Sequence, residues 1–410
     1  MNLTLVYSFC NAIFSNRDIV NIKTKQNKTM KTNKIKSAIS AVATCSLLGI
    51  VSLAPMAQVA NAEVTAPVGF VKLTFNAESD TPFSLPMNRP KVYNGQVVSI
   101  SGNTINIANA DFTASELVYA DGSQNEKYYL LFTTGTLEGR TFDVTANATD
   151  SITVDQDGDT DVATLNGSAT DNFEIRPHWT LNTLFPDGAG IDVSTDFSLP
   201  DQVILAKNTT DIGTRLQPTS SYYYYDSNDE YEGWYDNNDL SATNVGSTVL
   251  RNTLHYTFRN KKTEDLIKNI VGDVPLTDGT VQVATLSDEI QQDNHIAIPF
   301  PVEMTLDQAG FRQIPDFKTV TDFNVIDGDL ILEYPDNAGV LRPSPTASYF
   351  YYESGDSYEG WYDNNDLSRQ NLGVAKLIKP GRAYIFRRSA DKFEGKTFIK
   401  PIIPYSPLAE

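Results

Sequence analysis

Cysteine is almost absent from this sequence of 410 residues, which contains only Cys10 and Cys45. Both lie near the N-terminus, in a segment that we expect to be removed on export. The remaining chain then has no disulfide, no thiolate nucleophile and no cysteine-ligated metal site. Its fold must therefore rely on a packed core.

Histidine and recognisable catalytic motifs are also scarce. The three histidines, His178, His255 and His295, are far apart and show neither HExxH nor HxH spacing. The chain has no G-x-S-x-G nucleophile elbow and no G-x-x-x-x-G-K-[ST] phosphate loop. The sequence therefore predicts a protein that is not an enzyme. A polysaccharide-active enzyme is the third functional hypothesis, because two carboxylates distant in sequence can meet in a fold.

The chain has few positively charged residues: it contains 32 Lys or Arg and 51 Asp or Glu. Residues 1–62 hold seven Lys or Arg and one Asp, which leaves 25 basic and 50 acidic residues and a net charge of −25. Such a surface repels nucleic acid and anionic lipid and favours cations. We therefore expect no nucleic-acid partner.

Long apolar runs are limited to one, Ala38–Leu53, which is shorter than a membrane span. It follows three lysines after Met30 and precedes the small-residue pattern Ala60-x-Ala62. Residues 30–62 are thus predicted to be a signal peptide cut before Glu63. Residues 1–29 precede a complete signal peptide. Either the start codon has been placed too early and Met30 is the true start, or these residues are an extended leader. We expect an exported protein, periplasmic, cell-surface or extracellular, with no membrane span in its mature chain.

Helical periodicity is almost missing as well. Short β-branched or aromatic segments separated by Gly, Asn, Asp or Pro predict strands throughout. One helix is expected at 263–272, where Thr263 is a capping residue, EDLIKNIV carries an apolar stripe, and Gly272 ends it. This pattern predicts an all-β protein of the sandwich or barrel class with at most one short linker helix.

A tyrosine-rich stretch occurs twice. Residues 221–241 and 348–368 are identical at 17 of 21 positions, and weaker matches extend the repeat to about 180–260 and 305–388. A fainter match between DTPFSLPMNRP at Asp80 and DNHIAIPFPVE at Asp293 places an insertion of β-hairpins near 95–175. We therefore expect two related β-modules, 63–262 and 273–410, joined by the helix.

Several segments carry a resemblance to known proteins. GFVKLTF, SLPMNRPKVYNGQV, YYLLFTTGTLEGRTFDV, FEIRPHWTLNTLFP and DNHIAIPFPVEMTLDQAGF resemble an uncharacterised family of secreted β-rich proteins, best known from verrucomicrobial-type bacteria. The family has no established activity. The resemblance implies export and a β-architecture, and it adds no site residue.

The repeated aromatic residues allow two interpretations. Cross-strand packing in the core is one, and the replacement of Tyr223 by Phe350 in the second copy favours it, because packing does not need the hydroxyl. A flat platform for sugar rings is the other. The candidate ligand-binding residues are Tyr224, Trp234, Tyr235, Tyr351, Trp361 and Tyr362.

Alternating acids in DQDGDTD form the candidate calcium site. Its ligands would be Asp155, Asp157, Asp159 and Asp161. The glycine is fourth and Asn166 twelfth, which excludes an EF-hand loop. A solvated hairpin turn is the simpler explanation of the segment. No cofactor is therefore expected, and Ca²⁺ at this site is the alternative.

These observations lead to a functional expectation. An exported, acidic, duplicated scaffold without catalytic spacing predicts a non-enzymatic structural or adhesive protein of the cell surface or extracellular matrix. The alternative is a glycan-binding protein that uses the two Tyr/Trp hairpins. An extracellular glycan or matrix component is the expected partner.

Overall fold

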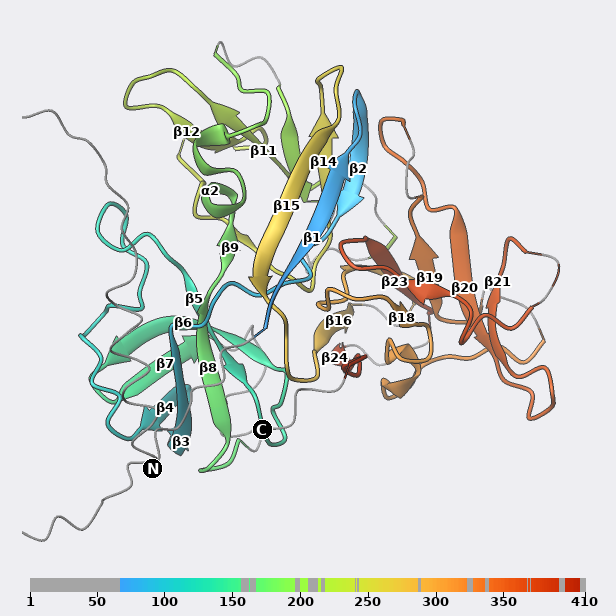
Figure 1. The fold of residues 1–410 in the computed structure, drawn as a ribbon. Coiled ribbons are helices and arrows are strands. Elements are labelled where there is room, and N and C mark those ends of the chain that lie inside the picture. Colours follow the sequence, from blue (N-terminus) through green and yellow to red (C-terminus); the bar gives the residue numbers. More distant parts are fainter. Residues whose placement is uncertain are drawn as a thin grey trace, which may run out of the picture. The chain divides into compact units, whose positions relative to one another are not determined.

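The computed structural model describes most of the chain between Pro67 and Tyr405. The described residues are 67–155, 162, 167–195, 200–205, 213–214, 218–239, 241, 243–286, 289–322, 327–335, 339–366, 368, 370–390 and 395–405. They fold mainly into strands, interrupted by the one-turn helix α2 (Leu181–Leu184) and the 3-10 helices η1 (Pro186–Gly188) and η2 (Phe311–Gln313). The predicted all-β class is confirmed (Figure 1).

Two five-stranded antiparallel sheets share one topology. The first has the order β12-β11-β10-β14-β2 and the second, read from its equivalent edge, β21-β20-β19-β23-β17. If the five strands of each sheet are numbered by their order in the chain, both sheets have the same order from one edge to the other: fourth, third, second, fifth, first. The strands are β2 (Ser79–Phe83), β10 (Gln202–Leu205), β11 (Ser220–Tyr225), β12 (Gly233–Asp236), β14 (Tyr256–Asn260), β17 (Gln292–Ile296), β19 (Leu330–Glu333), β20 (Ala347–Tyr352), β21 (Gly360–Asp363) and β23 (Tyr384–Arg388).

Each five-stranded sheet is accompanied by two antiparallel strand pairs, which again correspond between the two halves. In the first half β1 pairs with β15 and β9 with β13; in the second, β16 pairs with β24 and β18 with β22. These strands are β1 (Val68–Phe75), β9 (Trp179–Thr180), β13 (Val249–Leu250), β15 (Leu266–Asp273), β16 (Val281–Thr285), β18 (Met304–Thr305), β22 (Leu377–Ile378) and β24 (Gly395–Ile399). We call the sets around the first and second sheets module 1 and module 2.

A closed six-stranded barrel lies in the chain between β2 and β9 of module 1, with the order β3-β4-β7-β6-β5-β8. Its strands are β3 (Tyr93–Ser101), β4 (Thr104–Ile107), β5 (Tyr128–Phe132), β6 (Thr141–Ala148), β7 (Ser151–Asp155) and β8 (Asn172–Pro177). Register shifts at Val97/Ser99 and Val144/Ala146 bend two strands, as bulges do where a sheet closes. Alternating apolar residues fill the interior with a core of its own.

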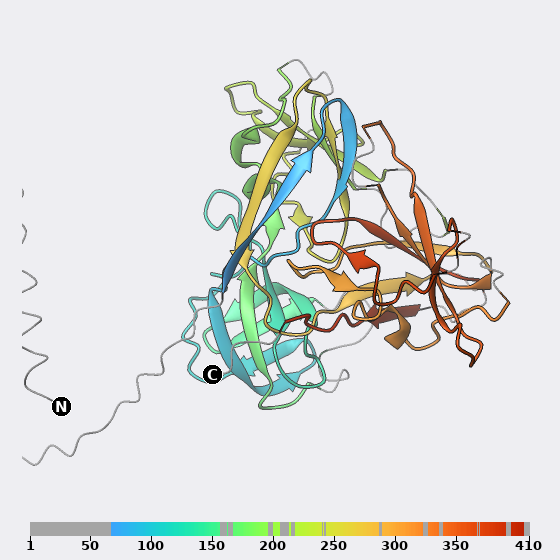
Figure 2. The ribbon, with the colours of Figure 1, turned by 45° about the vertical axis from the view of Figure 1, so that its right-hand side comes forward.

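The helix predicted at 263–272 is wrong: residues 266–273 form strand β15. β15 pairs with β1 over eight residues, so segments about 200 residues apart in the chain lie side by side (Figures 1 and 2). Ile270 is buried while Ile267 and Val271 face outward, the alternation of a half-buried strand. β-branched side chains also lose rotamer freedom in a helix. Tertiary pairing has therefore overridden the weak helical stripe. No helix among the described residues is long and apolar enough to cross a bilayer.

Modules 1 and 2 contact each other through reciprocal bonds. The backbone N–H of Asp80 on β2 donates to the carbonyl of Val340 at 3.1 Å, and that of Asp293 on β17 donates to Gly213 at 3.3 Å. Each aspartate also receives a two-point bond from an arginine of its own module. Arg259 donates to Asp80 at 2.7 and 2.8 Å, and Arg387 to Asp293 at 2.6 and 3.0 Å. Such self-complementary contacts are the pattern of a two-fold dimer, here within one chain.

Candidate ligand-binding cleft

The six aromatic residues predicted as a ligand platform lie in hairpins of identical register. Tyr224 is opposite Trp234 in the pair β11–β12, and Tyr351 is opposite Trp361 in β20–β21. The relative exposures of the two indoles are 0% and 1%. The other four residues, Tyr224, Tyr235, Tyr351 and Tyr362, are also buried. No ring face of this set is open to a ligand, so the structure supports core packing for them.

The two tryptophans pack edge-on against their tyrosines. The ring centroids of Tyr224 and Trp234 are 5.7 Å apart at 80°, and those of Tyr351 and Trp361 are 5.4 Å apart at 84°. This arrangement places a ring edge on a ring face, which aromatic quadrupoles favour. The modules differ in one detail. The indole N–H of Trp361 donates to Asp307 at 3.1 Å, whereas that of Trp234 has no hydrogen-bond partner within the described part of the chain.

The predicted calcium loop falls mostly outside the described residues. Asp155 ends strand β7, while Asp157, Asp159 and Asp161 lie in the segment that the structure does not describe. Within the described part of the chain, no group of three or more His, Cys, Asp or Glu side chains could hold a metal ion. The candidate site therefore remains a prediction.

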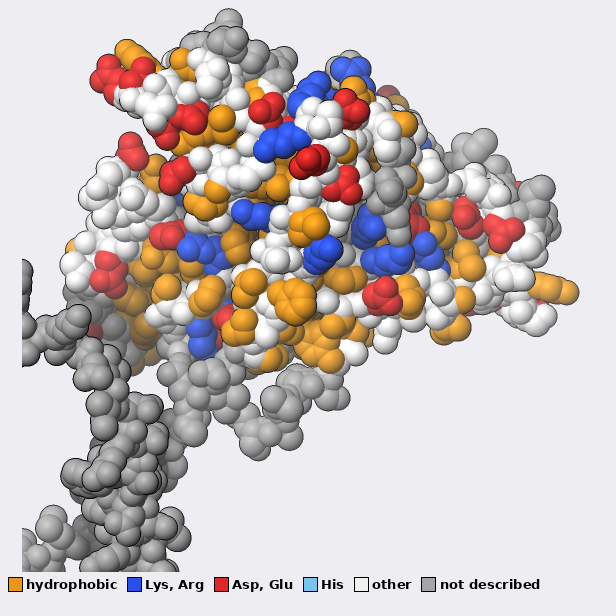
Figure 3. All heavy atoms as spheres, turned by 45° about the horizontal axis from the view of Figure 1, so that its top comes forward, with side chains coloured by type: hydrophobic (Ala, Val, Ile, Leu, Met, Phe, Trp, Pro, Cys, Tyr) orange, Lys and Arg blue, Asp and Glu red, His pale blue; other side chains and the backbone are white. Residues whose placement is uncertain are grey.

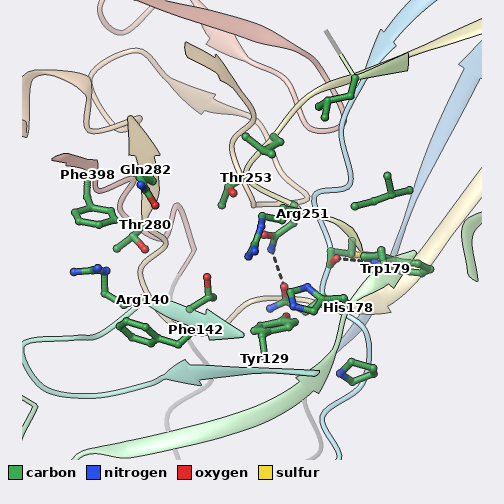
Figure 4. A pocket seen from close by; sticks show the side chains of 18 of the residues that line it. Tyr129, Arg140, Phe142, His178, Trp179, Arg251, Thr253, Thr280, Gln282 and Phe398 are labelled. Atoms are coloured by element: carbon green, nitrogen blue, oxygen red, sulfur yellow. Dashed lines mark hydrogen bonds between the residues drawn. The ribbon is translucent and has the colours of Figure 1, made fainter. Parts of the chain in front are cut away.

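A cleft of about 450 Å³ opens where the barrel, module 1 and module 2 meet. Its volume falls within the range of small-molecule sites. The barrel and the segment that leaves it supply Tyr129, Arg140, Thr141, Phe142, Pro177, His178 and Trp179. Module 1 supplies Met87, Asn88, Leu205, Leu250, Arg251, Asn252, Thr253 and Leu254, and module 2 with its preceding loop supplies Thr280, Gln282, Lys396 and Phe398. Figure 4 shows these side chains converging on one hollow.

Arg140 is placed in the cleft by a tight approach of two loops. It follows Gly139, whose φ is +78°, a region that favours glycine. A Cβ on Gly139 would lie 2.1 Å from the carbonyl oxygen of Asp278. The hydroxyl of Thr280 donates to the carbonyl of Gly139 at 2.7 Å. Because residue 139 is a glycine, the segment that leads into β6 can approach the loop before β16 closely, directly beside Arg140.

The guanidinium of Arg140 stacks between two aromatic rings. Its Cζ atom is 3.7 Å from the ring centroid of Phe398 and 5.4 Å from that of Phe142. Figure 4 shows Arg140 between these two rings. Stacking of this kind uses the faces of the guanidinium and leaves its N–H groups pointing out along the edge.

On the side of the cleft opposite Arg140, Asp143 holds two lining side chains in place by hydrogen bonds. Its carboxylate accepts two bonds from Arg251, at 2.7 and 3.1 Å, and a 2.9 Å bond from Nε2 of His178. Burial by itself would raise the pKa of Asp143, but His178 and Arg251 outweigh this and lower it. Burial lowers the pKa of His178, which the bond to Asp143 offsets only in part. At neutral pH the imidazole is therefore uncharged and donates its Nε2 proton to the aspartate.

The walls of the cleft combine aromatic faces with polar groups. The ring centroids of Tyr129 and His178 are 4.6 Å apart. Trp179 donates its indole N–H to the carbonyl of Met87 at 2.8 Å, which fixes the ring. Asn252 bonds Asn88 at 2.9 Å across the rim. Sugar ligands are bound by this mixture of ring faces and amide or hydroxyl groups.

Among the described residues, the charged side chains of the cleft lining are basic. Glycoside hydrolysis uses two carboxylates that flank the bond to be broken. Among the described residues that line the cleft there are Arg, Lys and His but no Asp or Glu. The carboxylate of Asp143, which bonds the lining residues His178 and Arg251, is occupied by three hydrogen bonds.

Sequence reasoning missed this cleft. Its lining residues range from Met87 to Phe398, and no repeat or motif connects them. One signal was present: Trp179 is the only tryptophan outside the two repeat copies, and it follows His178 directly. Comparison with known proteins does not identify the site, because no family model, no curated protein and no solved structure matches the chain.

Proposed function

We propose that this protein is an exported, non-enzymatic adhesive protein that holds an extracellular glycan or matrix component in the cleft. The signal-peptide pattern ahead of Glu63 and the acidic composition support export. One observation supports binding above all: aromatic, amide and guanidinium groups from three separate β-bodies converge on one hollow.

The scaffold suits a load-bearing role. Modules 1 and 2 are joined by reciprocal backbone bonds, and the backbone N–H of Arg342 in module 2 also donates to the carboxylate of Asp80 in module 1 at 2.8 Å. Each buried aspartate at this contact is held in place by an arginine of its own module, so the bonds between the modules start from fixed positions. An adhesive protein without disulfides needs such contacts to keep its binding surface intact.

Glycan binding by the two Tyr/Trp hairpins is disfavoured as a second candidate, because their indoles are buried. The exposed aromatic residues of these hairpins are Tyr231 and Tyr358, with exposures of 57% and 67%. Each lies in the turn before its tryptophan strand. They are single side chains rather than a platform, so the cleft is the better site.

The test is glycan-array binding of the mature protein and of a variant whose cleft is filled. Thr253→Trp places a large side chain in the lining, and we expect it to abolish binding to whichever glycan the parent protein holds. Thr243→Trp is the matched control, because Thr243 is exposed in a loop of module 1. Equal binding by both variants, or no glycan bound by the parent, would contradict the proposal. N-terminal sequencing of the exported protein should begin at Glu63.

A further inference from the structure

Arg140 differs from several other arginines of the barrel and modules in having no carboxylate partner among the described residues. Arg89 pairs with Glu126, Arg251 with Asp143, Arg259 with Asp80 and Arg387 with Asp293. No side-chain hydrogen bond or ion pair of Arg140 occurs among the described residues; its contacts are the rings of Phe398 and Phe142. Its in-plane N–H donors are thus available to a ligand.

The surroundings of Arg140 are unusual for this chain. Burial lowers its pKa, and no nearby acid raises it. A partly desolvated cation without a counter-ion is unfavourable, and an anionic ligand would relieve that cost. The overall formal charge of the chain is −19, yet the charged side chains among the described lining residues are Arg140, Arg251 and Lys396. On the face drawn in Figure 3, blue Lys and Arg side chains likewise lie among orange hydrophobic ones.

The charge of Arg251 is already matched. Asp143 neutralises it, and the uncharged His178 adds none. Arg140 therefore provides a positive charge that has no carboxylate partner among the described residues, next to aromatic rings and to the polar side chains of Thr280 and Gln282. The guanidinium fork matches the two oxygens of a carboxylate at two points.

We propose that the cleft binds the carboxylate of a hexuronic acid within an acidic polysaccharide, with Arg140 as the carboxylate-binding group. This inference rests on the proposed function and names its ligand class. Phe142 and Phe398 hold the guanidinium flat, so its edge is presented without loss of side-chain freedom on binding. Sugar hydroxyls would contact the amide and hydroxyl groups of the rim.

The experiment is calorimetric titration of the mature protein with oligogalacturonate, with a neutral galactose oligomer of equal length, with a sulfated oligosaccharide and with free acetate. We expect binding of the uronate oligomer alone among these four. Arg140→Gln should weaken it at least tenfold, because a two-point charged bond is lost. Arg140→Lys, which keeps the charge and loses the fork, should give an intermediate loss. Binding should also weaken below the pKa of the uronate carboxyl and as salt increases.

Arg312→Gln is the matched control. Arg312 also stacks on an aromatic ring, 3.6 Å from the centroid of Tyr351, but lies outside the cleft. Its substitution removes the same stacking contact and should leave the affinity unchanged. Thermal melting of every variant tests whether the fold persists.

The possible outcomes separate the two proposals. If the neutral oligomer binds equally well, or Arg140→Gln binds uronate as the parent does, the hexuronate inference is overturned while the adhesive function stands. Preference for the sulfated sugar would also overturn it in favour of another anion. Failure of all these probes to bind the folded parent protein would overturn the hexuronate inference, whereas the adhesive function is contradicted only if the glycan array also finds no bound glycan.

Discussion

A buried histidine pair at the boundary between modules 1 and 2 predicts acid sensitivity. His255 lies before β14 in module 1 and His295 on β17 in module 2, and both are almost fully buried. Nδ1 of His255 is 2.9 Å from the carbonyl oxygen of Tyr384, and its Nε2 is 2.7 Å from Nδ1 of His295. Because a carbonyl only accepts, Nδ1 of His255 carries the proton and Nε2 accepts from His295. This chain of bonds requires His255 to be neutral.

The sign of the pH effect follows from the direction of the pKa shift. Burial, together with the neighbouring His295, holds the pKa of His255 well below 6.5. The unfolded chain therefore binds a proton at this site more readily than the folded one does. The contribution of His255 to stability is complete above pH 6.5 and is lost as the pH falls. While the folded site stays neutral, one such histidine lowers the free energy of unfolding by about 1.6 kcal/mol between pH 6.5 and pH 5.

The measurement is the free energy of unfolding in urea at intervals from pH 7.5 to pH 5. His255→Gln is the informative variant, because glutamine can donate to Tyr384 and accept from His295 without titrating. Between pH 6.5 and pH 5 we expect its stability to fall by about 1.6 kcal/mol less than that of the parent protein. His178→Gln serves as the comparison, since the pKa of His178 is also lowered by burial. Identical pH profiles for His255→Gln and the parent would refute the reasoning.

Two further predictions concern the hairpins, and each is compared with a control substitution elsewhere in the chain. Asp307→Ala leaves the buried indole N–H of Trp361 without its acceptor, so the free energy of unfolding should fall by about 1–3 kcal/mol in urea denaturation. Asn182→Ala, at the corresponding place in module 1, should change stability less, because Trp234 has no such bond to lose; equal losses would contradict the assignment. Gly360→Ala should destabilise by more than about 1 kcal/mol, because φ is +154° and the new Cβ would lie 2.0 Å from Asn371. Gly102→Ala meets no atom within 4 Å at its own positive φ and should cost less in thermal melts; the reverse order would show that the Asn371 contact is readily relieved.

The sequence was informative where local pattern and local structure coincide. Alternating tyrosines followed by a polar turn and a Gly-Trp-Tyr strand predicted a hairpin, and the observed pairing of Tyr224 with Trp234 confirms it. The sequence pattern did not determine whether those rings are exposed or buried. Tyrosine and tryptophan suit either an open platform or a core, and here the strands β10 and β19 and the residues before them place both indoles inside.

The errors arose where distant segments decide the outcome. LIKNIVGD has an apolar stripe at helical spacing, but β1 offers a complete antiparallel partner nearly 200 residues earlier. The cleft is the stronger example. Arg140 and Phe398 stack although 258 positions separate them, and nothing near either residue indicates the other. A site built from the contact of three bodies leaves little trace in any one segment.

The inserted barrel supplies one wall of the cleft beside this matched pair of modules. Between β2 and β9, module 1 carries the six barrel strands, whereas residues 297–303 suffice between the equivalent strands β17 and β18 of module 2. Tyr129, Arg140, Phe142 and His178, which supply the floor and the open cation, all belong to the barrel or to its exit. The two modules are similar to each other, so the inserted barrel adds a cleft wall whose side chains differ from those of the modules. We infer that the paired modules supply rigidity and that ligand recognition depends on the barrel.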